Sequence, residues 1–165
     1  MGLNYPWRGL KIFIMTAKFQ YIIQLYLRTA LAAAYLKLGL DRLGALGSYG
    51  HSFVSWGDWK HFMEYARQVM GFLPSAIIPA FAVMATIAEI LFGILLLIGF
   101  CTRLAAAGSG VLAFLFAVAM AVSNGIQDPL GYSVFTVSAA SFLLATIPVY
   151  KWSIDDKLKN SIHKH

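Results

Sequence analysis

Long apolar runs dominate the chain, and only short polar breaks separate most of them. Four runs have the length of helical spans, at about 19–40, 75–99, 104–123 and 131–149. Roughly 20 apolar residues are needed for a helix to cross ~30 Å of hydrocarbon. Pro79 fits the first turns of the second run, where the early amides of a helix lack partners anyway. The pattern predicts one all-α domain over residues 1–165, an integral membrane four-helix bundle.

The connection between the first two runs has a pattern of its own. It begins with a glycine-rich passage, and the stretch after it repeats with a helical period. Apolar positions recur every three or four residues, and polar positions fall on the opposite face. The apolar set is Trp56, Trp59, Met63, Ala66 and Met70, and the polar set is Asp58, His61, Glu64 and Gln68. This predicts an amphipathic helix at about 56–70 that lies in the membrane interface or caps the bundle. Between the third and fourth runs, "NGIQDP" predicts a turn.

Composition and charge strengthen the membrane interpretation. The sequence is 59% hydrophobic and 12% charged, with a mean hydropathy of +0.70, whereas soluble domains carry about 25% charged residues. The net charge of +6 comes mostly from basic residues beside the runs, which is typical of topology signals and lipid head-group contact and argues against nucleic-acid binding. Eight basic residues fall on the side of the termini and four on the other side. We therefore expect a multi-pass protein of the inner (cytoplasmic) membrane with both termini in the cytoplasm.

Two charged residues lie deep inside the apolar runs, far from either end. Arg28 is nine residues from the start of the first run, or about 13.5 Å, and Glu89 is ten residues from the end of the second, or about 15 Å. The two helices are expected to be antiparallel, so both groups would reach similar depth. An isolated charge at the bilayer centre costs at least ~2.5–3.5 kcal/mol. We expect Arg28 and Glu89 to meet, directly or through water.

The surroundings of Arg28 suggest a polar interior. Tyr21, Gln24 and Tyr35 share its helix face at spacings of four and seven residues. Two interpretations stay open: the pair locks the bundle together, or with these residues it forms a pocket for a quinone-like head group.

A weaker candidate lies in the connection. Asp58, His61 and Glu64 could contribute to a metal site, but no second histidine completes a known ligand spacing. An ordinary solvated helix face is the favoured interpretation, and no metal is expected.

The order of these features resembles the DoxX family of small four-span membrane proteins, which includes the DoxD-type small subunit of thiosulfate:quinone oxidoreductase. The matching stretches are "YLRTALAAAYLKLGLDRL", "WGDWKHFMEYARQVMGFLPSAIIP", "AEILFGILLLIGFCTRLAA" and "DPLGYSVFTVSAASFLLATIPVYKWSIDD". The resemblance implies a four-helix bundle and a membrane subunit of a quinone-linked oxidoreductase that acts on a sulfur compound. It implies that quinone is a ligand and that no cofactor is bound covalently. It also implies a partner subunit or a homo-oligomer among membrane lipids.

Other functions fit the same sequence. A non-catalytic assembly, anchoring or chaperone-like subunit would use the amphipathic helix as a docking surface. Small-molecule transport is least supported, because the sequence shows no inverted repeats. At most, we expect the chain to be the membrane subunit of an enzyme.

Overall fold

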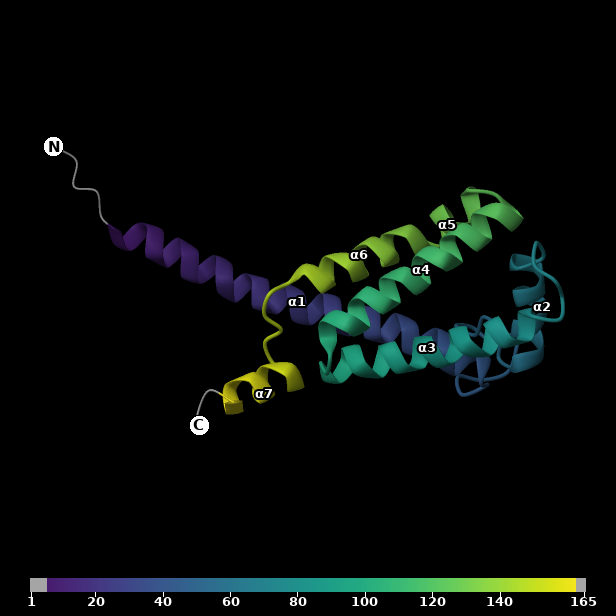
Figure 1. The fold of residues 1–165 in the computed structure, drawn as a ribbon, viewed down its shortest axis with the longest axis horizontal. Coiled ribbons are helices and arrows are strands. Elements are labelled where there is room, and N and C mark those ends of the chain that lie inside the picture. Colours follow the sequence, from purple (N-terminus) through teal and green to yellow (C-terminus); the bar gives the residue numbers. More distant parts are fainter. Residues whose placement is uncertain (1–5, 163–165) are drawn as a thin grey trace.

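The computed structural model describes the backbone of residues 6–162 and the side chains of residues 18–161. Within this part of the chain there are helices and no strands, which confirms the all-α class. Figure 1 shows α1, α3, α4 and α6 running alongside one another, with α2 across one end. The helices are α1 (Pro6–Arg42), α2 (Trp59–Val69), α3 (Ile78–Ile98), α4 (Thr102–Asn124), α5 (Gln127–Gly131), α6 (Val134–Thr146) and α7 (Ile154–Ile162).

The helix lengths differ from the predicted spans in an informative way. Among the described residues, α3 and α4 alone are long and apolar enough to cross a membrane. The predicted first run lies inside α1, which has 37 residues and begins well before residue 19. The predicted fourth run is divided: α6 keeps 13 residues, and the expected turn "NGIQDP" runs into the short helix α5. The turn consists of Gly125 and Ile126 alone, so the part of the prediction that covered residues 127–129 was wrong.

The amphipathic helix is present, close to the predicted bounds. Asp58 begins α2 as its N-cap, since its carboxylate accepts a hydrogen bond from the His61 amide at 2.9 Å. The buried side chains of α2 pack against the start of α3, at Ile78 and Ala82. They are Phe62, Met63 and Ala66. Trp56 was expected on this helix, but it precedes α2 and lies in the loop that leads to it.

Small residues let the helices approach closely. A β-carbon on Gly93 of α3 would lie 2.8 Å from the Leu36 side chain of α1, so only glycine fits there. In the centre of the bundle, the hydroxyl of Tyr35 donates to the carbonyl oxygen of Ser109 at 2.8 Å and lies 3.3 Å from the hydroxyl of Ser141. The interior therefore contains polar side chains whose bonds connect α1, α4 and α6.

The bundle has two distinct ends, which we name after the helices that cover them. At the α2 end, α1 finishes, α3 begins and α2 packs on both α3 and α4. At the α7 end, α3 finishes at Gly99 and α4 begins at Thr102. Both α7 and the N-terminal half of α1 lie at this second end (Figure 1). The helix α7 was not predicted from the sequence.

Candidate functional site

The buried carboxylate of Glu89 pairs with Arg42, near the α2 end. Arg42 Nη2 donates to Glu89 Oε1 at 3.0 Å, and Arg42 Nη1 lies 2.7 Å from Glu89 Oε2. Arg42 Nη1 also donates to the Thr86 hydroxyl at 3.0 Å. The two charged residues are 3% and 1% exposed. Each charge therefore depends on the other, because either one alone would be costly to bury there.

Aromatic rings surround the guanidinium of Arg42. Its Cζ lies 4.1 Å from the ring centre of Phe62 in α2, 5.1 Å from that of Trp56 and 5.9 Å from that of Phe116 in α4. Tyr65 extends the cluster, with its ring centre 5.5 Å from that of Trp56. Cations over aromatic faces are stabilised by the ring quadrupole, more so away from water. The site is thus a charged centre inside an aromatic enclosure.

Two polar atoms of the pair have unused hydrogen-bonding capacity. Arg42 Nε has no hydrogen-bond partner, although it is buried. Glu89 Oε2 is close to Arg42 Nη1 but makes no hydrogen bond of good geometry. Buried polar atoms are usually satisfied, so each of these two atoms is free to bond to a further polar group.

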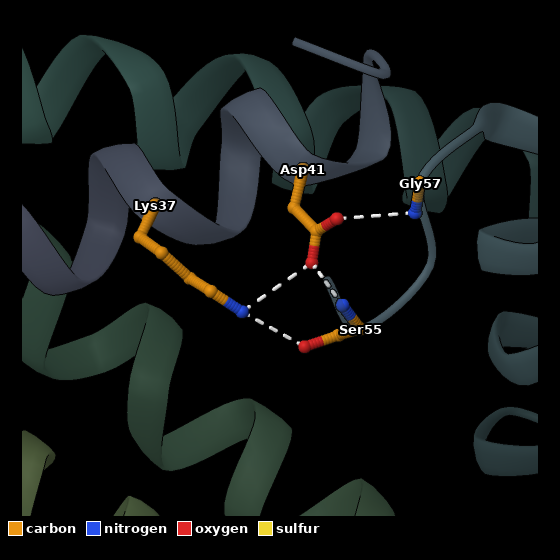
Figure 2. A network of polar contacts seen from close by, with 4 residues as sticks. All are labelled: Lys37, Asp41, Ser55 and Gly57. Atoms are coloured by element: carbon orange, nitrogen blue, oxygen red, sulfur yellow. Dashed lines mark hydrogen bonds and ion pairs between the residues drawn. The ribbon is translucent and has the colours of Figure 1, made fainter. Parts of the chain in front are cut away.

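A second carboxylate, Asp41, fixes the loop beside this site (Figure 2). It accepts hydrogen bonds from the amides of Ser55 at 2.7 Å and Gly57 at 3.0 Å, and from the ammonium group of Lys37 at 3.3 Å. Burial raises the pKa of Asp41, but these three donors more than offset that effect and hold the pKa below its ordinary value. Asp41 is therefore an ionised anchor for the loop residues on either side of Trp56.

The expected pairing of Arg28 with Glu89 is wrong. Arg28 is buried at the α7 end, where its Nη2 donates to the carbonyl oxygen of Trp152 at 2.8 Å. Its guanidinium packs so closely on Gly99 that a β-carbon there would lie 2.6 Å from Nη1. Arg28 thus fastens the segment before α7 to the end of α3.

The error came from the register of the two helices. The prediction requires residue 19 to lie level with Gly99, whereas Arg28 itself lies beside Gly99. Ten residues of α3 then separate Arg28 from Glu89, or about 15 Å. Arg42 is 14 residues further along α1, and helical side chains lean toward the N-terminus of their helix. Its long side chain therefore reaches back to Glu89.

The other predicted pocket residues are divided between the two regions. Gln24 is buried at the α7 end, where its amide nitrogen donates to the carbonyl oxygens of Tyr21 and Lys151. The ring of Tyr35 lies buried in the middle of the bundle. None of Tyr21, Gln24 and Tyr35 contacts the pair through a hydrogen bond described for residues 18–161.

The predicted metal candidates do not converge. His61 Nδ1 lies 2.8 Å from Asp58 Oδ2, and its ring stacks on Tyr49 at 4.0 Å. Within the described part of the chain, no three His, Cys, Asp or Glu side chains are grouped so that they could hold a metal ion. Glu64 remains apart, as an exposed residue of α2.

Sequence reasoning missed Arg42, Thr86 and the rings around them. Arg42 comes two residues after the predicted end of the first run, so it belongs to the four basic residues expected on the side away from the termini. The glycines at the contact between α1 and α3 define how the two helices align. Gly39 faces Ile90, and Gly93 faces Leu36. Aligning α1 and α3 on these two contacts brings the end of α1 to Glu89.

The fold and the site together define a small helical bundle with apolar, span-length helices and a buried arginine–glutamate pair. The chain belongs to the DoxD family: the family model "TQO small subunit DoxD" matches residues 19–165. The family is that of the small subunit of thiosulfate:quinone oxidoreductase. A small subunit implies a partner subunit in a complex. No curated protein and no solved structure gives a match to the chain.

Proposed function

We propose that this chain is the membrane-embedded subunit of a thiosulfate:quinone oxidoreductase-type complex, and that the Arg42–Glu89 pair binds the quinone head group. One observation carries the proposal. Arg42 Nε and Glu89 Oε2 are buried with unused hydrogen-bonding capacity, inside an enclosure of aromatic rings.

The exposed faces of the span-length helices support a membrane location. Large apolar side chains cover the outward faces of α3 and α4 along their length. They include Phe81, Met84, Ile87, Leu91, Ile94, Leu97, Leu104, Val111, Leu115, Val118 and Val122. A soluble protein rarely exposes a continuous apolar surface of this kind, whereas lipid tails would cover it without cost. The bilayer is the natural surrounding of these two helices.

The chemistry of a quinone head group matches the site. A quinone is a flat ring with carbonyl oxygens at opposite edges, so it needs hydrogen-bond donors at an edge and apolar or aromatic contacts on its faces. Arg42 Nε offers a donor, and Trp56, Phe62 and Phe116 offer ring faces. Reduction of a quinone takes up two electrons and two protons, and we assign the delivery of a proton to the Glu89 carboxylate.

The electrons must come from another subunit. The chain has one cysteine, and its sequence contains no haem-attachment motif and no glycine-rich phosphate loop after a strand. We therefore assign oxidation of the sulfur compound to the partner subunit and quinone binding to this chain.

Quinone-induced thermal stabilisation tests this function. A soluble short-chain quinone should raise the melting temperature of the detergent-purified protein, and Glu89→Gln should abolish that rise. The matched control is Glu64→Gln, which changes an exposed carboxylate on α2. An equal quinone effect in wild type and Glu89→Gln contradicts the proposal.

A second function, as a non-catalytic assembly subunit, is favoured by a different feature of the same pair. Arg42 and Glu89 join α1 to α3 and are closed over by α2, as expected of a structural lock. If Arg42→Leu/Glu89→Leu folds and still supports quinone reduction by the complex, the pair acts only as that lock.

A further inference from the structure

We propose that Asp41 is a positioning residue that holds Trp56 over Arg42 and thereby controls access to the Arg42–Glu89 pair. The inference rests on the proposed function, because access matters only if a ligand enters. Two adjacent residues then have different roles. Arg42 forms the ion pair, and Asp41 holds the loop that carries Trp56.

The first step is the geometry of the loop. Trp56 stands between two residues whose amides donate to the same carboxylate, Ser55 at 2.7 Å and Gly57 at 3.0 Å. Asp41 comes directly before Arg42 at the end of α1. The carboxylate therefore ties both flanks of Trp56 to the helix that carries the guanidinium.

The second step is the rigidity of this attachment. Lys37 Nζ lies between the Asp41 carboxylate, at 3.3 Å, and the Ser55 hydroxyl, at 2.8 Å (Figure 2). Gly57 has a φ of 68°, and a β-carbon there would overlap the backbone of Tyr49. The loop therefore follows a path that only glycine permits.

The third step is what the loop covers. Trp56 contacts Arg42 from one side while Phe62 of α2 covers it more closely, with ring centres at 5.1 Å and 4.1 Å from Arg42 Cζ. Phe62 belongs to a helix with a buried apolar face, whereas Trp56 belongs to a loop. The Trp56 ring also packs on Phe62 and Tyr65 of α2, with ring centres 5.3 and 5.5 Å away. Its backbone is held by the loop and not by a helix, so the bonds from Ser55 and Gly57 to Asp41 fix the ring in these contacts.

Labelling of Glu89 by dicyclohexylcarbodiimide measures access directly. This apolar reagent adds to carboxyl groups away from water, and mass spectrometry of the α3 peptide reads the modification. Asp41→Asn replaces an acceptor oxygen by an amide group that cannot accept the loop amide. We expect the labelling rate of Glu89 to rise about tenfold, equivalent to the loss of one charge-assisted hydrogen bond.

Fluorine NMR of 5-fluorotryptophan-labelled protein measures the ring itself. The resonance of Trp56, assigned with Trp56→Phe, should shift in Asp41→Asn, while that of Trp152 at the α7 end should not. Lys37→Met removes one of the three hydrogen-bond donors to Asp41, so the Trp56 resonance should shift in the same direction but by less. This variant carries the test if Asp41→Asn does not fold. Asp58→Asn is the matched control, because its carboxylate bonds to His61 instead.

The outcomes separate this inference from the proposed function. If Asp41→Asn and Lys37→Met leave both Glu89 labelling and the Trp56 resonance at wild-type values, the inference is overturned. An equal rise in Asp58→Asn overturns it as well. If labelling rises as expected but quinone fails to stabilise the wild-type protein, the positioning role of Asp41 stands and the quinone function falls. If quinone stabilises the wild-type protein but Glu89 labelling does not change in Asp41→Asn, the quinone function stands and the positioning role of Asp41 falls.

Discussion

The same helix, α1, carries a buried arginine to each end of the bundle, and the two ends use it differently. Arg42 meets a carboxylate side chain, Glu89, together with a hydroxyl and three aromatic rings. Arg28 meets a backbone carbonyl and the close surface of Gly99. Arg42 thus pairs with an ionisable side chain among aromatic rings, whereas Arg28 bonds to the main chain.

The segment around Arg28 explains this structural role. Asp155 accepts hydrogen bonds from the amides of Cys101 and Thr102 at 2.9 and 2.8 Å, and its own amide donates to the carbonyl oxygen of Gly99 at 3.0 Å. A carboxylate at the start of α4 satisfies free amides and complements the helix dipole. At the α7 end, the segment before α7 and the first turn of α7 therefore join α1, α3 and α4.

The largest expected effect comes from breaking the pair at the α2 end. Arg42→Leu leaves Glu89 buried without its partner, which we expect to cost about 3–5 kcal/mol of unfolding free energy. Arg42→Leu/Glu89→Leu should recover most of this loss, because no uncompensated charge remains. Unfolding of the purified variants in detergent checks both values. Equal destabilisation of the single and double variants would show that the pair contributes through packing alone.

A smaller effect is expected at the α7 end. Arg28→Leu removes a charged donor from the carbonyl oxygen of Trp152, at a cost of about 1.5–3 kcal/mol. The cost should appear locally, as faster proteolysis and hydrogen exchange in residues 150–156. Quinone-induced stabilisation should persist, unlike in Glu89→Gln. If Arg28→Leu abolishes the quinone effect and Arg42→Leu/Glu89→Leu retains it, the roles of the two ends are reversed.

The helix cap at the α7 end gives a milder perturbation. Asp155→Ala removes the acceptor for the amides of Cys101 and Thr102 at the start of α4, and loss of such a capping carboxylate costs about 0.5–2 kcal/mol. Thermal unfolding should report this modest loss. The exposed Lys159→Ala in α7 is the control and should change the melting temperature little.

The contrast also shows what the sequence could predict. Apolar runs of the right length located α3 and α4, and the helical spacing of Met63 and Ala66 located α2. The isolated charge of Glu89 correctly indicated a buried ion pair. Its partner could not be found by counting residues, because the register between α1 and α3 depends on which small residues meet. Trp56 was missed as a site residue because a loop places it there.

The smallest expected effect concerns Asp41, and acid should reveal it. Its pKa in the folded protein lies below the unfolded value of about 3.9, so ionised Asp41 stabilises the fold above that pH. This contribution should be lost as the pH falls through the folded pKa. The difference in melting temperature between wild type and Asp41→Asn should therefore be constant near neutrality and shrink below about pH 4.

Asp58 is the control for this acid effect, because contacts with His61 also hold its pKa below the ordinary value. Asp58→Asn should retain the part of the acid response that Asp41 supplies, whereas Asp41→Asn should lose it. A difference between wild type and Asp41→Asn that stays the same from pH 7 to pH 3 would mean that the charge of Asp41 contributes nothing to the loop. The hydrogen bonds to Ser55 and Gly57 would then act through geometry alone, and the two ends of α1 would differ less than their contacts suggest.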